Sequence, residues 1–131
     1  MEGWNHLWLG EIDAAIAQFQ FALRLSPLDS RFNLAQTGLA YGHFFAGRNE
    51  EASTWAATAA RQRPNHLGAQ RIMMACNAVS GRVDEAREIC ARLMQLNPAL
   101  RISRMKDRAP FRRAEHIERL AQAYRIAGMP E

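Results

Sequence analysis

The stretch GRVDEAREICARLMQLNPAL, residues 81–100, decides the fold, because two earlier parts of the chain repeat it. Residues 10–29 read GEIDAAIAQFQFALRLSPLD, and residues 47–66 read GRNEEASTWAATAARQRPNH. The copies begin 37 and then 34 residues apart. A repeat period of this length predicts stacked helical units, none of which buries its apolar face alone.

Each copy carries signals for where helices begin and end. It opens on a glycine, which can adopt the left-handed conformation that ends one helix before the next begins. Aligned alanines follow, and we expect them to be buried where helices meet. Each copy closes on a proline, which cannot continue a helix interior. These residues are Gly10, Gly47 and Gly81, then Ala15, Ala52 and Ala86, then Pro27, Pro64 and Pro98. With apolar residues at helical spacing between them, the predicted helices span 2–8, 11–25, 30–45, 49–62, 66–79 and 83–96.

The copies resemble the tetratricopeptide (TPR) repeat, whose pattern is W-x2-L-G-x2-Y, then A-x3-F, then P. The second half of the pattern is kept, with Ala15 and Phe19, Ala52 and Ala56, and Ala86 and Cys90 ahead of the three prolines. The first half departs from it: the second unit has Gln36, Leu39, Ala40 and His43, and the third has Gln70, Met73, Met74 and Asn77. The resemblance covers residues 1–100 and implies pairs of antiparallel helices.

We therefore expect one all-α domain over residues 1–131, a TPR-type α-solenoid of antiparallel helix pairs with a C-terminal capping helix. Its parts are a truncated unit (1–29), a second unit (30–66), a third unit (67–100), a basic connector (101–112) and a capping helix (113–131). Ser103 is a candidate N-cap for one short helix in the connector. The capping helix would cover the last unit with Ile117, Leu120 and Tyr124.

The net charge of +4 comes from the C-terminal part of the chain, since residues 1–100 carry as many acidic as basic residues. The basic patch consists of Arg101, Arg104, Lys106, Arg108, Arg112 and Arg113. A basic strip can contact phosphates, but this one has a single aromatic residue, Phe111, and no helix that would read a nucleic-acid groove. We interpret it first as a solvated connector, next as a docking surface for an acidic protein, and last as a nucleic-acid or membrane contact.

No catalytic, cofactor or metal motif is present in the sequence: there is no His-Glu-x-x-His and no phosphate-binding glycine loop. We therefore expect no enzyme, no cofactor and no metal site. Cys76 and Cys90 lack redox spacing and read as buried thiols, while His6 and His43 read as packing residues. No apolar run approaches the roughly 18 residues of a membrane span, and the start of the chain lacks a signal-peptide pattern. A cytoplasmic location is expected.

In TPR proteins the first helix of each unit lines a concave face where partners usually bind, so the resemblance places a partner-binding site there. The predicted site residues are Trp4, Leu7, Trp8, Thr37, Tyr41, Phe44, Phe45, Arg71 and Ala78. On the alternative interpretation, several residues of this face pack between neighbouring helices. Leu34 and Ala75 are the residues for which this packing role is most expected. Because the aromatic residues are bulkier than core closure requires, we expect an exposed apolar patch, which usually marks an interaction site. With Arg71 as its single cation, the face suits an apolar segment or a partner helix better than a peptide carboxylate.

A second, narrower resemblance involves GRNEEASTWA (47–56), RLSPLD (24–29) and the C-terminal PFRRAEH and AGMPE. These are similar to bacterial multidomain proteins in which a class III adenylate/guanylate cyclase or winged-helix DNA-binding domain precedes TPR units. Met1 also falls partway into the first helix, so we expect Trp4 and Trp8 to lack an upstream cover and to favour a homodimer.

The expected function is a protein–protein interaction module that binds a protein or peptide partner. The alternative is a regulatory or sensory domain of a bacterial cyclase or transcription regulator. Nucleic-acid contact through the basic connector is a third, less favoured reading.

Overall fold

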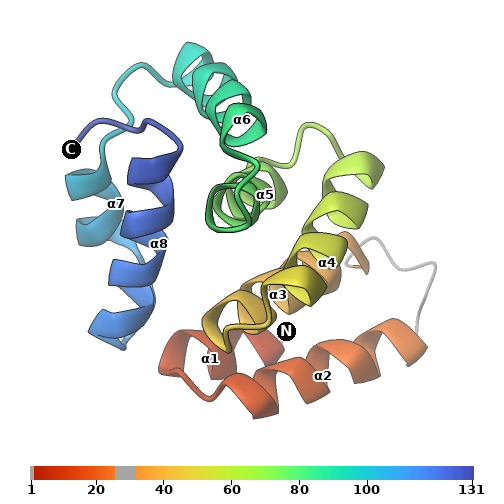
Figure 1. The fold of residues 1–131 in the computed structure, drawn as a ribbon. Coiled ribbons are helices and arrows are strands. Elements are labelled where there is room, and N and C mark those ends of the chain that lie inside the picture. The colour runs from red at the N-terminus through yellow and green to blue at the C-terminus, as the bar shows by residue number, and fades with distance from the viewer. Residues whose placement is uncertain (1, 26–31) are drawn as a thin grey trace.

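The computed structural model describes residues 2–25 and 32–131, and this part of the chain is built from α-helices without a strand. The helices are α1 (Glu2–Leu9), α2 (Ile12–Leu25), α3 (Phe32–Phe45), α4 (Asn49–Gln62), α5 (Leu67–Val79), α6 (Val83–Leu96), α7 (Ile102–Arg108) and α8 (Ala114–Ile126). Figure 1 shows their order in space. The predicted all-α fold and helix positions are confirmed to within one residue at each described end. Pro27 and the predicted helix start at residue 30 lie outside the described residues.

The three repeats end their first helices in the same way. Gly10, Gly47 and Gly81 have φ angles of 85°, 83° and 85°, a left-handed conformation that side chains make costly. In each turn the N–H of the residue after the glycine donates to the carbonyl oxygen five residues earlier. The three bonds, Glu11 to His6, Arg48 to His43 and Arg82 to Asn77, measure 2.8, 2.9 and 2.9 Å. The internal repeat in the sequence is therefore also a repeat of backbone geometry.

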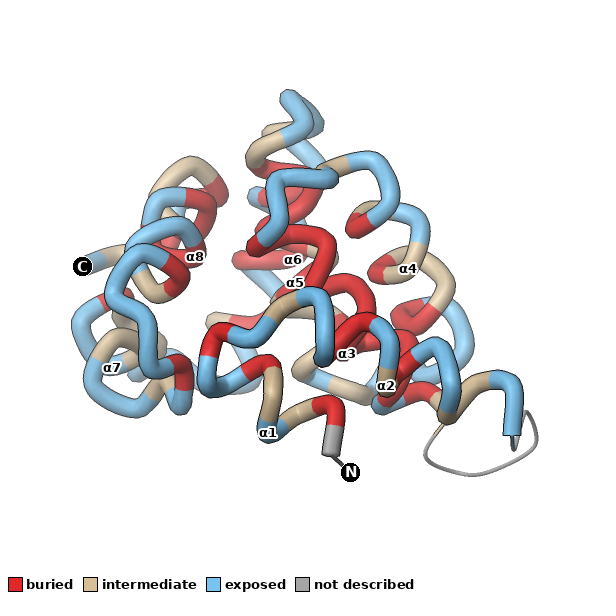
Figure 2. The backbone as a smooth tube through the Cα atoms, turned by 90° about the horizontal axis from the view of Figure 1, so that it is seen from below, coloured by how far each residue is buried: buried red, intermediate tan, exposed pale blue. Residues whose placement is uncertain are grey.

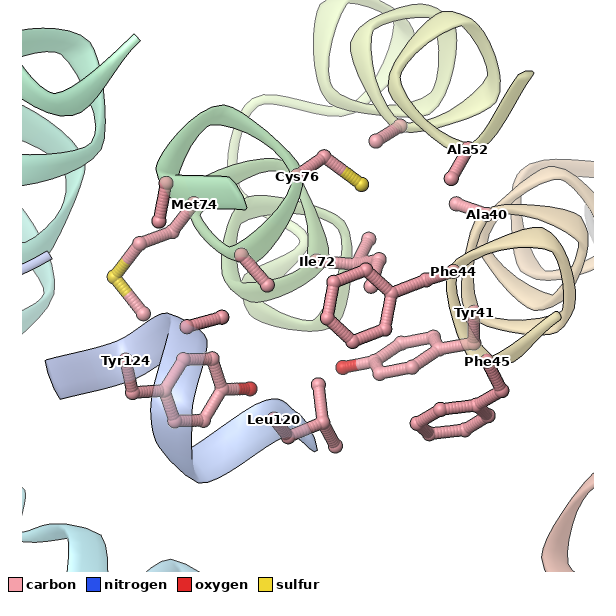
Figure 3. Packing of buried hydrophobic residues seen from close by; sticks show 14 of the residues in the cluster. Ala40, Tyr41, Phe44, Phe45, Ala52, Ile72, Met74, Cys76, Leu120 and Tyr124 are labelled. Atoms are coloured by element: carbon pink, nitrogen blue, oxygen red, sulfur yellow. The ribbon is translucent and has the colours of Figure 1, made fainter. Parts of the chain in front are cut away.

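The first helices of the three pairs, α1, α3 and α5, lie next to one another, and α8 packs against α5. We call α1, α3, α5 and α8 the inner row; α2, α4 and α6 each pack on the inner helix before them. Small residues permit close approach between these partners. Ala15, Ala52 and Ala86 are completely buried, as predicted, and Figure 3 shows Ala52 facing Ala40 of α3.

One close approach depends on a glycine inside α3. A Cβ atom at Gly38 would lie 2.2 Å from the ring of Phe19, which is completely buried. The ring of Phe19, on α2, therefore fills the space that a side chain at position 38 of α3 would need. This contact fixes the distance between the second and third helices.

The C-terminal end is anchored to α7. Ile102 and Ser103 donate their N–H groups to the carbonyl oxygens of Pro130 and Glu131, at 2.9 and 3.0 Å. The hydroxyl of Ser103 donates to the same Glu131 oxygen at 2.7 Å. The predicted N-cap at Ser103 is therefore wrong: Arg101 holds the N-cap position, and the serine side chain instead binds the C-terminal residues.

The position of α8 agrees in part with the predicted cap. It follows α5 in the inner row, with Leu120 and Tyr124 buried and Ile117 half-buried. Figure 2 shows the buried residues of α8, α5 and α3 gathered where these helices face one another. In addition, residues 111–129, here called the C-terminal segment, extend to α3 and to the end of α1.

Candidate binding site between the inner row and the C-terminal helices

The C-terminal segment is joined to α3 by aromatic contacts. The ring of Phe111 lies 5.8 Å from that of Tyr41 and 4.9 Å from that of Phe45, measured between centroids. His116 stacks on Phe45 at 4.4 Å. Figure 3 shows Tyr41 and Phe45 turned toward α8, which carries Leu120. Offset and edge-to-face ring contacts of this kind add to the free energy gained from burial.

One backbone hydrogen bond links the same segment to α1. The N–H of Arg112 donates to the carbonyl oxygen of Trp8 at 2.7 Å. The guanidinium of Arg119 lies over the ring of Phe44, 5.3 Å from its centroid, an arrangement in which cation and ring attract. Residues from both ends of the chain therefore meet over α3.

These contacts correct the expectation of an exposed aromatic face. Six of the nine predicted site residues are buried inside the chain: Leu7, Thr37, Tyr41, Phe44, Phe45 and Ala78. For Tyr41, Phe44 and Phe45 the physical reason is that the apolar side of the C-terminal segment needs cover as much as α3 does, so each buries the other. The packing interpretation holds for Ala75, which is buried, but not for Leu34, which is 40% exposed.

The two N-terminal tryptophans have different surroundings. Trp4 is half-buried, with its ring 5.4 Å from Phe19 and 6.1 Å from Tyr41. Trp8 remains 37% exposed. The expected homodimer relied on both tryptophans being uncovered, and that premise is wrong for Trp4.

A pocket of about 460 Å³ lies between the inner row and α7. Five predicted site residues line it: Trp4, Trp8, Thr37, Tyr41 and Arg71. Leu34 and residues around the start of α5 complete that wall. The rest of the lining comes from the connector and the C-terminal segment, and includes Arg101, Arg104, Met105, Arg108, Phe111, Tyr124 and Met129. We call this cavity the arginine pocket.

The predicted basic patch is divided by the fold. Arg104 and Arg108 are four residues apart, which puts them on one side of α7, and Arg101 precedes this helix at its N-cap. All three arginines line the arginine pocket. The other three basic residues do not line it. Lys106 pairs with Glu118, Arg113 lies 3.5 Å from Glu115, and Arg112 is exposed.

The arginine pocket is cationic without a compensating acid. Four arginines line it, and no Asp or Glu of the described ranges does. Arg71, Arg104 and Arg108 form no ion pair with a described carboxylate, and Arg101 donates only to the carbonyl oxygens of Pro98 and Leu100. No carboxylate of the described residues therefore neutralises the positive charge of the pocket lining.

The phenols beside the pocket stay protonated at neutral pH. Burial raises the pKa of Tyr41, and it raises the pKa of Tyr124 well above its ordinary value. Arg71 opposes both shifts in part, because its positive charge favours a phenolate. Both side chains therefore present neutral hydroxyls next to a cation.

His66 is held in a fixed position at the rim. Its Nδ1 lies 2.6 Å from Oδ1 of Asn33, and the amide nitrogen of Asn33 donates to the carbonyl oxygen of Ala59 at 2.8 Å. Burial, Arg63 and Arg71 lower the pKa of His66. The imidazole is therefore neutral near pH 7 and adds no charge to the arginines.

A second cavity, of about 480 Å³, lies between α4, α5 and α6. Its lining contains both signs of charge, and Arg82 is already engaged: its guanidinium donates to Asn77 and Ser53 at 2.9 and 3.0 Å and lies 3.6 Å from Glu85. The arginine pocket is the better candidate site, because its cations are available to a ligand.

The described residues offer neither a metal-ligand cluster nor a membrane-spanning helix. No group of three His, Cys, Asp or Glu side chains comes together as metal ligands there. No helix in the same part of the chain has the length and apolarity needed to cross a membrane.

No protein-family profile, curated protein or solved structure matches this chain. The similarity to TPR proteins therefore rests on the repeated residues alone.

Proposed function

We propose that this chain is a TPR-type protein–protein interaction module that binds a partner segment at the arginine pocket. One observation carries the proposal: Trp8 and Leu34, large apolar side chains that are 37% and 40% exposed, stand at a cavity that four arginines also line. Aromatic residues and arginine are the usual anchors of protein interfaces, and exposed apolar residues around a cavity favour burial by a partner.

The site suits a short segment better than a long helix. The C-terminal segment already covers Tyr41 and Phe45, and α8 occupies the place beside α5 where a partner helix would lie. A partner is therefore expected to insert one or two apolar side chains into the pocket while its backbone crosses the rim.

Selection from a displayed library of random peptides tests this proposal. The expected result is a family of related peptides that bind the unmodified chain and lose binding when Trp8→Ser and Leu34→Ser are combined. Leu96→Ser is the matched control, because Leu96 is 71% exposed on α6 and does not line the pocket. A failure to enrich any peptide family would overturn the proposal. So would peptides that bind the double variant as well as the control.

A second candidate function is regulatory: a sensory domain that controls an attached cyclase or transcription factor. It is favoured by the position of the arginine pocket between the inner row and α7, so that a bound ligand would contact both ends of the chain at once. Hydrogen exchange of α7 and α8 with and without ligand tests it: slower exchange in both helices is expected, and unchanged exchange contradicts it.

The structure gives nucleic-acid contact less support than the run of basic residues in the sequence does. Three of the six basic residues line the pocket, and two of the others pair with glutamates.

A further inference from the structure

We infer that the arginine pocket binds a small amphipathic anion, meaning a carboxylate, sulfonate or phosphate group attached to an aromatic or aliphatic body. The inference deepens the second candidate function and rests on the proposed function only for the location of the site. It follows from three features of the pocket: its charge, its apolar lining and its size.

The charge of the lining selects an anion. Arg104 and Arg108 lie on one side of α7, Arg71 approaches from α5, and no described carboxylate competes for them. An arginine guanidinium offers a planar pair of N–H donors that match the two oxygens of a carboxylate or phosphate.

The apolar lining favours a ligand that carries an apolar group, either a ring or an alkyl chain. Trp4 and Trp8 provide partly exposed aromatic surface, and Leu34 and Met105 provide partly exposed aliphatic surface. A bare inorganic ion would leave these side chains partly exposed to water. A ring or alkyl chain would bury them while its acidic group reaches the arginines.

The size of the pocket agrees with a small molecule. Ligand cavities in proteins measure about 300–1,000 Å³, and this one measures about 460 Å³.

Two fluorescent probes separate the role of charge from that of apolar contact. 8-Anilinonaphthalene-1-sulfonate carries a sulfonate, and N-phenyl-1-naphthylamine has the same rings without it. We expect the sulfonate probe to bind with a single-site isotherm at least about tenfold more tightly than the neutral probe, because one charge-assisted hydrogen bond contributes about this factor or more.

Substitution of the α7 arginines locates the probe. Arg104→Gln combined with Arg108→Gln should weaken sulfonate-probe binding by at least about tenfold and leave the neutral probe unchanged. The control combines Arg61→Gln with Arg87→Gln, which removes the same charge from exposed sites that do not line the pocket. Thermal melting of both double variants checks that each is folded. Equal binding of the two probes, or an equal loss in both double variants, overturns the inference.

Competition then identifies the class of ligand. Dodecanoate or 1-naphthoate should displace the sulfonate probe at concentrations where inorganic phosphate does not. Stronger displacement by dodecanoate would indicate a ligand with an alkyl body, and stronger displacement by 1-naphthoate would indicate a ligand with an aromatic body. Displacement by phosphate at the same concentrations would mean a plain anion site and would contradict the inference. If the probe binds but no peptide family is selected, the protein-interaction proposal is contradicted and this inference stands. If peptides are selected but the probe does not bind, this inference is contradicted and the protein-interaction proposal stands.

Discussion

The imidazole of His116 on α8 stacks on the ring of Phe45 on α3, with centroids 4.4 Å apart and ring planes 10° from parallel. These residues are 71 positions apart in the sequence, and both are buried. The Nδ1 atom of His116 is buried without a hydrogen-bond partner among the described residues. The C-terminal segment is therefore part of the same core as α3.

Stability should fall in mild acid. Burial is the main cause that lowers the pKa of His43, His66 and His116 below the usual value of about 6.5. In each case the unfolded state binds a proton more readily than the folded state, so the free energy of unfolding decreases as pH drops below about 6.5. Urea denaturation at pH 7.5 and pH 5.0 measures this decrease.

The variant His116→Phe keeps the stacked ring and removes one of these protonation sites. Its loss of stability between the two pH values should be smaller than that of the unmodified chain. An identical loss would show that His116 does not contribute to the pH dependence.

Leu120 of α8 should be essential to the core. Leu120→Ala is expected to lower the free energy of unfolding by about 2–5 kcal/mol, because it opens a cavity between buried side chains. Leu120 is 2% exposed. Leu96→Ala removes the same atoms from an exposed position and should change stability by less than about 0.5 kcal/mol. Denaturant unfolding compares the two, and equal effects would mean that α8 is only loosely attached.

Gly81 should be required for its backbone conformation alone. Its φ is +85°, and a Cβ atom there would meet nothing within 4 Å. Gly81→Ala should therefore destabilise the chain by about 1–2 kcal/mol through backbone strain. Ser80→Ala, at the neighbouring exposed position with φ −93°, should have little effect. Thermal melting of both variants measures these changes in stability. A Gly81→Ala variant as stable as the unmodified chain would contradict the strain argument.

The thiol of Cys76 should be unreactive in the folded protein. Burial raises its pKa to about 12, and burial also raises the pKa of Cys90. Because the thiolate is the reactive form, the thiol reagent DTNB at pH 8 should label neither cysteine until denaturant is added. Rapid labelling of the native chain would show that these side chains are accessible.

The local part of this fold could be predicted from the sequence. The glycines that end the first helices and the alanines that follow them act through their immediate surroundings, so Gly47 marks a turn and Ala52 marks a helix contact without knowledge of the rest. Cys76 and Cys90 are buried, as their positions on apolar helix faces indicated.

The position of the C-terminal segment could not be predicted in the same way. Its apolar side, with Leu120 and Tyr124, can cover any apolar surface of suitable shape, and periodicity does not say which one. The prediction placed it over the third unit alone, whereas Phe111 and His116 also bury α3. For this reason the aromatic residues expected on the surface are largely inside.

The arginine pocket was missed because a run of basic residues usually lies in solvent. One signal in the sequence could have found it: Arg101, Arg104 and Arg108 have the spacing of a single helix side. Their position opposite Trp4 and Tyr41, however, depends on contacts between distant parts of the chain.

The C-terminal segment over α3 both covers the aromatic residues and contributes to the pocket lining. A nuclear Overhauser spectrum of the ligand-free chain tests this arrangement directly. We expect cross-peaks between ring protons of Phe45 and His116 and between those of Tyr41 and Phe111, whose centroids lie 4.4 and 5.8 Å apart. Absence of both cross-peaks, with the rings of Tyr41 and Phe45 exposed to solvent, would contradict it.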